Sequence, residues 1–324
     1  MNILITGGAG YVGSVLTPYL INLGHKVTIY DLMIYDTKIK QNSNLSIVKG
    51  DIRDYEKIKN SLKDQDIVIH LACISNDPSF ELNPNLGKSI NLDSFVPLVE
   101  ASLFNGVKRF IYASSSSVYG IKKEKDVHEG MELEPLTDYS KFKAECEKIL
   151  LDYNSNNFDP VIVRPATVCG YSPRQRLDVV VNIFANFAFN KRKIQIFGGD
   201  QLRPNIHIND MCEVYSLLIN SETSKIKGKI FNAGFENKKV IELAEIVKNV
   251  MGDDIELVIK ETDDQRSYHI SSNKIYNELG FKNKFTITDA VKDLKKAFED
   301  KLLLNSFDDE NYFNIKKMQS IKLN

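Results

Sequence analysis

The sequence predicts an α/β protein in which a doubly wound parallel sheet is joined to a smaller mixed α/β part. Through the first half, short apolar runs alternate with segments of helical period, which is typical of a parallel sheet covered by helices on both faces. After Gly170 the pattern changes to shorter strands and helices in mixed order. A length of 324 residues also suffices for roughly two domains.

The expected elements of the first half are read from this alternation. Strands are expected at Asn2–Thr6, Lys26–Asp31, Leu45–Gly50, Asp66–Ala72, Arg109–Ser114 and Pro160–Arg164. Helices are expected from Tyr11 to about Gly24, from Leu86 to Asn105 and from Tyr139 to about Asn154. Pro97 should kink or divide the second of these helices, because proline lacks the backbone N–H that a helix interior needs.

The pattern after Gly170 predicts a second, smaller unit. Its expected elements are helices at Asp178–Asn190, Asp210–Asn220 and Val240–Met251, strands at Lys193–Phe197, Lys229–Ala233 and Glu256–Lys260, and two late helices. We expect residues 1–168 to form the first domain, with 206–232 returning to it, and residues 169–205 and 233–310 to form the second. Residues 311–324 are polar and lysine-rich and are expected to fray as a tail.

Composition excludes several classes of protein. Hydrophobic residues make up 43% and charged residues 26%, so neither a disordered chain nor a collagen-like fibre is expected. Forty-two basic and 43 acidic residues nearly cancel, which gives no reason to expect a nucleic-acid or membrane-surface partner. Four dispersed cysteines argue against a zinc or disulfide scaffold, so no metal is expected. The chain shows no signal-peptide pattern and no apolar run of about 20 residues, so a cytoplasmic protein without a membrane span is expected.

A glycine-rich turn follows the first strand. Gly8, Gly10 and Gly13 fit the spacing G-x-G-x-x-G and lead into the first helix, whose free N–H groups can bind a pyrophosphate. Asp31 ends the second strand 18 residues past Gly13, where an acid binds ribose hydroxyls and repels a 2′-phosphate. The alternative is an ordinary turn followed by a solvated aspartate. We favour a Rossmann-type NAD-binding domain, with NAD preferred over NADP, and cofactor contacts at Gly7, Gly10, Tyr11, Val12, Gly13 and Asp31.

Asp51 is a second candidate in the same domain. It follows the third strand in Gly50-Asp51-Ile52, a position that lies over the adenine pocket of a doubly wound sheet. Asp51 and Ile52 are therefore expected to contact the cofactor. The alternative is an aspartate that caps the helix after Arg53.

Tyr139 and Lys143 are spaced i, i+4 at the start of an expected helix, so both lie on one face. A lysine ammonium near a phenol favours the phenolate, and tyrosine can then act as a general base on a sugar hydroxyl. The fifth strand ends in four consecutive serines, Ser114 to Ser117, at the edge where open α/β sheets bind ligands. His70 also ends an apolar strand and is expected to be a core residue with satisfied polar groups.

With these motifs, the sequence resembles the extended short-chain dehydrogenase/reductases, in particular the NAD-dependent nucleotide-sugar epimerase/dehydratase group. The resemblance covers nearly the whole chain. It rests on Thr6–Gly13, Gly50–Asp54, His70–Ala72, Asn91, Ser114–Gly120, Tyr139-x-x-x-Lys143, Arg164–Gly170 and Arg203–Asp210. It also implies a homodimer or higher homo-oligomer, built through the helix at 86–105 and the helix that begins at Tyr139.

The resemblance implies a role for each catalytic residue. Tyr139 deprotonates the C4 hydroxyl of a nucleotide-diphosphate sugar, Lys143 lowers the pKa of Tyr139 and holds the nicotinamide ribose, and Ser115 shares the hydrogen bond. NAD takes the C4 hydride and leaves a 4-keto sugar. The resemblance also places Leu71, Ala72, Asn91, Pro165 and Val168 beside the cofactor and Ser116 beside the substrate.

One departure from the family bears on the reaction. Dehydratases of the group carry an Asp-Glu pair directly after the catalytic Ser/Thr, where this chain has Ser116 and Ser117, which do not easily serve as that acid and base. A 4-epimerase is therefore expected. A 4-dehydrogenase or 4-ketoreductase is the alternative, followed by a 4,6-dehydratase and by a noncatalytic NAD-sensing protein of the same fold.

Four arginines are expected to bind the substrate diphosphate, because guanidinium groups pair well with phosphate oxygens. Arg203 follows Phe197-Gly198-Gly199, Arg174 and Arg176 lie in the loop after Gly170, and Arg266 lies farther on. The alternative for each is a solvated surface position. The second domain is accordingly expected to bind the substrate.

Overall fold

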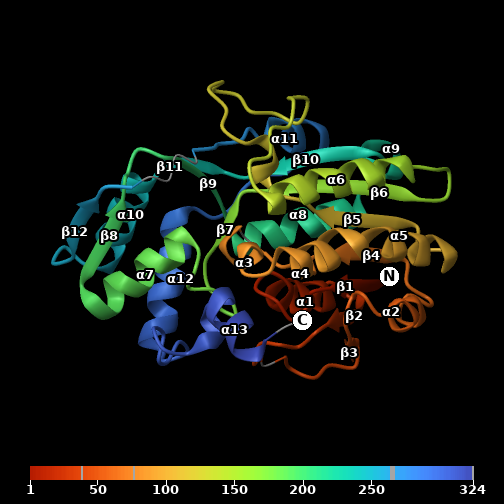
Figure 1. Ribbon diagram of the computed structural model, residues 1–324, viewed down its shortest axis with the longest axis horizontal. Helices are drawn as coiled ribbons and strands as arrows, with labels where there is room; N and C mark the ends of the chain where they lie inside the picture. Colours follow the sequence, from red (N-terminus) through yellow and green to blue (C-terminus); the bar gives the residue numbers. More distant parts are fainter. Residues whose placement is uncertain (38, 76, 263–266, 323–324) are drawn as a thin grey trace.

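The computed structural model describes residues 1–37, 39–75, 77–262 and 267–322 and is built around a seven-stranded sheet (Figure 1). The strand order is β10-β6-β5-β4-β1-β2-β3, and every neighbouring pair is parallel. The order reverses between β1 and β4, so a crevice forms at the carboxyl ends of these strands. The predicted doubly wound sheet is confirmed. Its strands are β1 (Asn2–Thr6), β2 (Lys26–Asp31), β3 (Leu45–Lys49), β4 (Ile67–His70), β5 (Arg109–Ala113), β6 (Asp159–Pro165) and β10 (Lys229–Ala233).

Helices cover both faces of this sheet. One face packs against α1 (Gly13–Asn22), α8 (Ile208–Asn220) and α11 (Asn273–Leu279), and the other against α2 (Tyr55–Ser61), α5 (Phe95–Phe104) and α6 (Asp138–Asp152). Alternate residues of β1 divide between the two cores: Ile3 and Ile5 join the first, and Leu4 joins the second. Because both faces are buried, the strands read as continuous apolar runs in the sequence.

The helical segment before β5 is divided, as expected, but just ahead of Pro97. Helix α4 (Pro84–Lys88) continues into a π-helical turn (Ser89–Asp93), and α5 then begins at Phe95. Pro97 is the third residue of α5, where a missing N–H costs little because the first helical N–H groups have no intrahelical partner. The division therefore falls one turn earlier than the proline itself.

The second unit has its own core, formed by α7 (Val180–Lys191), α10 (Val240–Met251) and α12 (Ile287–Glu299). Strands β8 (Lys193–Phe197) and β12 (Glu256–Lys260) pair in parallel, as a two-stranded sheet. A three-stranded sheet joins β11 (Glu236–Lys239), β9 (Leu202–His207) and β7 (Thr167–Cys169). The chain also forms two short helices, α3 (Asp77–Glu81) and α9 (Thr223–Ile226), and 3₁₀ turns at Ser116–Tyr119 and Glu310–Tyr312.

The expected tail is wrong over most of its length. Residues Asn314–Ile321 form helix α13, which packs back on the first domain through Met318, a member of the core beside α5 and α6. Asn314 at its start is buried and hydrogen-bonded to residues of three other segments. Lys316 of this helix is exposed, whereas Lys317 is largely covered and pairs with Glu310 at 2.8 Å. The polar composition of the segment therefore did not reveal its buried side.

Two features are not found in the described part of the chain. No helix there is long and apolar enough to cross a bilayer. The same residues contain no group of three or more histidine, cysteine, aspartate or glutamate side chains that could hold a metal ion.

His70 is the core histidine that the sequence predicts. Its ring is 2% exposed, its Nδ1 lies 2.7 Å from Thr6 Oγ1, and it stacks on Tyr112. Burial, aided by the charge of Lys143, lowers the pKa of His70 to about 3. The neutral imidazole is therefore strongly favoured in the folded protein.

Acid should therefore destabilise the protein through His70. An unfolded histidine takes up a proton near pH 6.5, whereas the folded one does not until about pH 3. The free energy of unfolding should fall between these values, by up to roughly 1.4 kcal/mol per pH unit. Urea unfolding at pH 7, 5.5 and 4.5 measures this slope, and His70→Asn should flatten it. Equal slopes in the two proteins would contradict the assignment.

Candidate active site

A cavity of about 760 Å³ lies at the carboxyl ends of the central strands, between the sheet and the second unit. Its walls include the glycine turn after β1, the ends of β2, β4, β5 and β6, the start of α6 and the loop before α7. Residues from α7, α8, α10, β8, β9 and α13 also line it. The topology thus brings both units to the position where open α/β sheets bind ligands.

The glycine turn owes its shape to three residues that line the cavity, Gly7, Gly10 and Gly13. Gly7 has φ +73°, and a Cβ there would lie 2.7 Å from the backbone nitrogen of Ala72. A Cβ on Gly13 would lie 2.6 Å from the carbonyl oxygen of Gly7, so α1 can start directly on the turn. Gly8, the first glycine of the motif, is not among the described lining residues, and a Cβ there would lie 2.8 Å from Cγ1 of Ile29.

Asp31 lies at the carboxyl end of β2 and lines the same cavity. Its carboxylate accepts hydrogen bonds from the backbone N–H groups of Ala9 (3.0 Å) and Met33 (2.8 Å). Burial raises the pKa of Asp31, and these two bonds oppose that rise. A tight turn, a helix amino terminus and a half-buried carboxylate in one cavity are the groups that a dinucleotide needs, so the site fits NAD.

Two of the expected cofactor residues are placed differently. The Asp51 carboxylate pairs with Arg53 at 2.7 Å, and Asp51 is outside the described cavity lining, although its neighbour Ile52 is within it. Asp54, not Asp51, caps α2. Asn91, in the π-helical turn, accepts a hydrogen bond from the backbone of Ile74 (2.8 Å) and donates one back (3.0 Å). Asn91 therefore holds the loop after β4, and does not line the cavity in the described structure.

The remaining expected cofactor residues line the cavity. They are Tyr11, Val12, Ile52, Leu71, Ala72, Pro165 and Val168. The Tyr11 hydroxyl donates to the carbonyl of Gly170 at 2.7 Å, which ties the glycine turn to the loop of the second unit.

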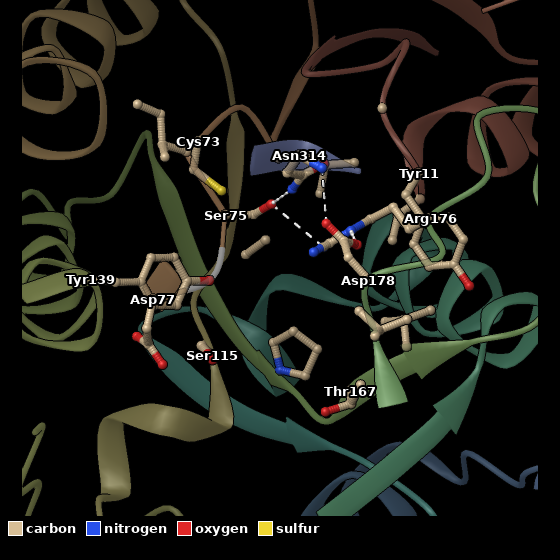
Figure 2. Close-up of a pocket in the computed structure, with 18 of the residues that line it drawn as sticks. Tyr11, Cys73, Ser75, Asp77, Ser115, Tyr139, Thr167, Arg176, Asp178 and Asn314 are labelled. Carbon is tan, nitrogen blue, oxygen red and sulfur yellow. Dashed lines mark hydrogen bonds and ion pairs between the residues drawn. The ribbon is translucent and has the colours of Figure 1, made fainter. Parts of the chain in front are cut away.

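Ser115, Tyr139 and Lys143 all line the cavity. Figure 2 shows Ser115 and Tyr139 there. Helix α6 begins there because Thr137 and Ser140 form a capping box, which places Tyr139 in the first turn. The Lys143 ammonium, one turn later, donates to the carbonyl of Ala113 at 2.6 Å and lies 5.8 Å from the centre of the Tyr139 ring. Ser115 caps the 3₁₀ turn and lies 2.9 Å from the hydroxyl of Ser117.

The predicted lowering of the Tyr139 pKa is wrong for the protein alone. Burial raises the pKa of this phenol well above 10, and the nearby Cys73 and Asp77 add to the rise. Arg176 and a hydrogen bond with Ser115 act in the opposite direction. The Lys143 charge is engaged by a backbone carbonyl, and desolvation outweighs the cationic neighbours.

Asp77 is a cavity residue that the sequence interpretation missed. It begins α3, accepts a hydrogen bond from Thr137 Oγ1 at 2.6 Å and thereby fixes the start of α6 beside Tyr139. Figure 2 shows its carboxylate next to the Tyr139 ring. The available signal was the stretch Ser75-Asn76-Asp77-Pro78 directly after a strand end, where polar residues reach the ligand edge of a sheet.

A family profile decides the identity. The profile of the "NAD dependent epimerase/dehydratase family" matches residues 3–234. The chain belongs to this family. It is thus an NAD-dependent enzyme of the nucleotide-sugar epimerase/dehydratase type, and its cofactor is NAD, in agreement with the glycine turn and Asp31.

Relatives of this epimerase/dehydratase cover almost its full length. A dTDP-glucose 4,6-dehydratase of Actinoplanes sp. is 26% identical over 314 residues, 90% of this chain and 95% of that protein. A UDP-glucose 4-epimerase of Lactobacillus helveticus is 26% identical over 335 residues, 93% of this chain and 100% of that protein. Both reactions therefore occur among relatives at the same distance.

Solved structures agree with this family assignment. The UDP-glucose 4-epimerase of Thermotoga maritima, solved with UDP-glucose, is 26% identical with a TM-score of 0.85 and covers 93% of this chain and 100% of its own. The UDP-N-acetylglucosamine 4-epimerase of Methanobrevibacter ruminantium M1, in complex with UDP-N-acetylmuramic acid, is 26% identical with a TM-score of 0.83 and covers 93% and 98%.

The four expected substrate arginines of the epimerase/dehydratase fall in different places. Arg203 lines the cavity from β9, and its guanidinium lies 5.2 Å from the ring centre of Tyr268. Arg176 lines it from the loop before α7, where it pairs with Asp178 at 2.8 Å and reaches Ser75 at 3.5 Å (Figure 2). Arg174 also lines it, on the side of Asp31 and Tyr35. Arg266 lies outside the described residues.

Proposed function

We propose that this enzyme oxidises C4 of a nucleotide-diphosphate sugar through Ser115, Tyr139 and Lys143 and reduces the keto sugar again on its opposite face, as a 4-epimerase. The observation that carries the proposal is the meeting of these three side chains in the cavity that also contains the dinucleotide turn. Ser116 and Ser117 line the same cavity, so the positions that carry an acid pair in the group's dehydratases hold hydroxyls here.

Each of the three residues has its own role in the oxidation of C4. Tyr139, as a phenolate, removes the proton of the C4 hydroxyl while the C4 hydride leaves, so that the C–O single bond becomes a carbonyl. NAD, when bound, supplies the acceptor for that hydride. Lys143 places a positive charge beside the phenolate, and Ser115 donates a hydrogen bond to the substrate oxygen. Tyr139 returns the proton when the keto sugar is reduced.

Loss of water would need further groups. A 4,6-dehydratase must remove the C5 proton and protonate the leaving C6 hydroxyl. A serine hydroxyl is too weak an acid and base for either step at neutral pH without an activating neighbour. Asp77 is the carboxylate beside Tyr139, but it already accepts the Thr137 hydrogen bond that fixes α6. These features favour epimerisation over dehydration.

The product distinguishes the reactions. UDP-glucose, UDP-N-acetylglucosamine and dTDP-glucose, each incubated with the enzyme in heavy water, are followed by mass spectrometry and NMR. We expect a product of unchanged mass, inverted at C4, formed without added oxidant and without deuterium, because only hydride moves between sugar and cofactor. Accumulation of one equivalent of NADH would instead identify a 4-dehydrogenase. Loss of one water with deuterium at C5 would identify a dehydratase and contradict the role given to the serines.

A further inference from the structure

Arg174 occupies an unusual environment in the loop between β7 and α7. Its side chain is 4% exposed, and its guanidinium carbon lies 3.5 Å from the ring centre of Tyr35. One terminal nitrogen, Nη2, donates to Asn314 Oδ1 at 2.5 Å. The guanidinium is thus held in one plane, with its position set by an aromatic ring and an amide.

The neighbours of Arg174 belong to the dinucleotide side of the cavity. Its backbone N–H donates to Ser14 Oγ at 3.3 Å, in the first turn of α1 directly after the glycine turn. Tyr35 lies four residues past Asp31, and the charge of Arg174 acts on the Asp31 carboxyl, whose pKa it tends to lower. By contrast, Arg203 and Phe197 line the cavity from strands β9 and β8 of the second unit.

Two nitrogen atoms of this guanidinium, Nε and Nη1, are buried and have no hydrogen-bond partner among the described residues. The two acids whose charges interact with Arg174 do not supply one, because Asp178 pairs with Arg176, and Asp31 accepts its hydrogen bonds from the backbone N–H groups of Ala9 and Met33. Leaving charged donors buried and unpaired is costly, and the side chain lines the cavity. A bound molecule that presents oxygen atoms, above all anionic ones, would complete the pairing.

We propose that Arg174 binds a phosphate oxygen of the dinucleotide cofactor, on its adenosine side, and does not bind the sugar nucleotide. The proposal rests on the NAD site and not on the reaction at C4. It reassigns a residue for which the sequence predicts a substrate contact, and it leaves Arg176 on the substrate side, within electrostatic reach of Tyr139. Because Asn314 of helix α13 holds Arg174, the proposal makes α13 part of the cofactor site.

Asn314 is the positioning residue of this arrangement. Its Oδ1 accepts from both Arg174 and the Tyr35 hydroxyl (2.9 Å), and its Nδ2 donates to Ser75 Oγ at 2.9 Å. Its backbone N–H donates to Asp178, the partner of Arg176. Asn314 therefore sets the guanidinium plane of Arg174 without needing to touch the cofactor.

Binding measurements test the proposal without any turnover. Protein freed of bound nucleotide is titrated by calorimetry with NAD⁺, ADP-ribose, adenosine and UDP. Arg174→Met should raise the Kd of NAD⁺ and of ADP-ribose by roughly tenfold to a hundredfold, the range for a lost charged hydrogen bond. The Kd of adenosine, which lacks phosphate, and that of UDP should stay nearly constant.

Arg176→Met is the matched control from the same loop and should weaken UDP or sugar-nucleotide binding more than ADP-ribose binding. Asn314→Ala should weaken ADP-ribose binding less than Arg174→Met does, and should add nothing in the Arg174→Met background, because it acts through that side chain. If Arg174→Met unfolds, Arg174→Lys, which keeps the charge but not the planar fork, replaces it in the same titrations.

Three results would overturn the proposal. The first is unchanged ADP-ribose affinity in a folded Arg174 variant. The second is a loss confined to UDP, which would return Arg174 to the substrate side. The third is an equal loss for adenosine and ADP-ribose, which would place the contact on the nucleoside. These binding measurements do not depend on turnover, so they test the role of Arg174 even if the enzyme proves not to be a C4 epimerase.

Discussion

Replacement of Tyr139 by phenylalanine is expected to lower the rate of hydride transfer by roughly 10²- to 10⁴-fold, the usual effect of removing a general acid–base group. The change deletes one hydroxyl and keeps the ring beside Lys143, so the fold and the binding of NAD should persist. Single-turnover absorbance of the nicotinamide, after addition of the sugar nucleotide that the product screen identifies, measures the step directly.

Tyr112→Phe is a suitable control for this variant. Tyr112 also lies under the Lys143 ammonium, at 4.8 Å from the ring centre, but it is buried in β5 and is not among the described residues of the cavity. Its turnover should change by no more than about twofold, as for a substitution outside the reacting groups. Near wild-type turnover in Tyr139→Phe, or equal losses in both variants, would refute Tyr139 as the base.

If Tyr139 is the base, the site must also stabilise its phenolate form. Because burial, Cys73 and Asp77 all raise the pKa of Tyr139, the fraction of phenolate in the protein alone is small at neutral pH. The reaction therefore needs the cationic side of the site, Lys143 and Arg176 together with the bound oxidised cofactor, to oppose that rise.

Much of the fold was predictable from the sequence because its central strands are buried on both faces. Continuous apolar runs mark β1 and β2, which begin and end at the expected residues, and the glycine turn between them marks α1. Strand β9 was missed for a physical reason. It contains Pro204, which cannot donate to a ladder and argues against a strand, yet it lies between β7 and β11.

The site was predictable where a motif reports chemistry directly, and less so where placement depends on tertiary packing. Ser115, Tyr139 and Lys143 meet as expected because their spacing follows from a strand end and one helical turn. Nothing local in the sequence tells which side of the cavity Arg174 faces, since that depends on Tyr35 and on Asn314, which is 140 residues away. The Tyr139 pKa likewise depends on burial, which the i, i+4 spacing does not report.

The largest effect on stability is expected from a buried ion pair behind the proposed catalytic residues. Glu147, one turn past Lys143 on α6, pairs with Arg164 of β6: Nε donates to Oε1 at 2.9 Å and to Oε2 at 3.2 Å, and Nη2 donates to Oε2 at 2.6 Å. Both side chains are 3% exposed. Glu147 also accepts from the hydroxyl of Ser114, and Arg164 donates to the Tyr119 hydroxyl at 2.8 Å. The network thus joins α6, β6, the 3₁₀ turn and Ser114, the residue between the end of β5 and Ser115.

Glu147→Ala should lower the free energy of unfolding by roughly 3–5 kcal/mol, because it leaves the Arg164 guanidinium buried without its counter-charge. Denaturant unfolding measures this loss. The exposed pair Lys296–Asp300 provides the comparison, and Asp300→Ala should change stability only slightly.

The double variant Glu147→Met with Arg164→Met decides between two causes of that loss. If the cost comes from an unpaired buried charge, removing both charges and filling the space with apolar side chains should recover most of the stability. Turnover should not recover with it, because Ser114, the residue directly before Ser115, loses its hydrogen-bond acceptor. A double variant as unstable as Glu147→Ala would show that packing, and not charge pairing, holds this region together. A double variant with full turnover would show that Ser115 is positioned independently of the network.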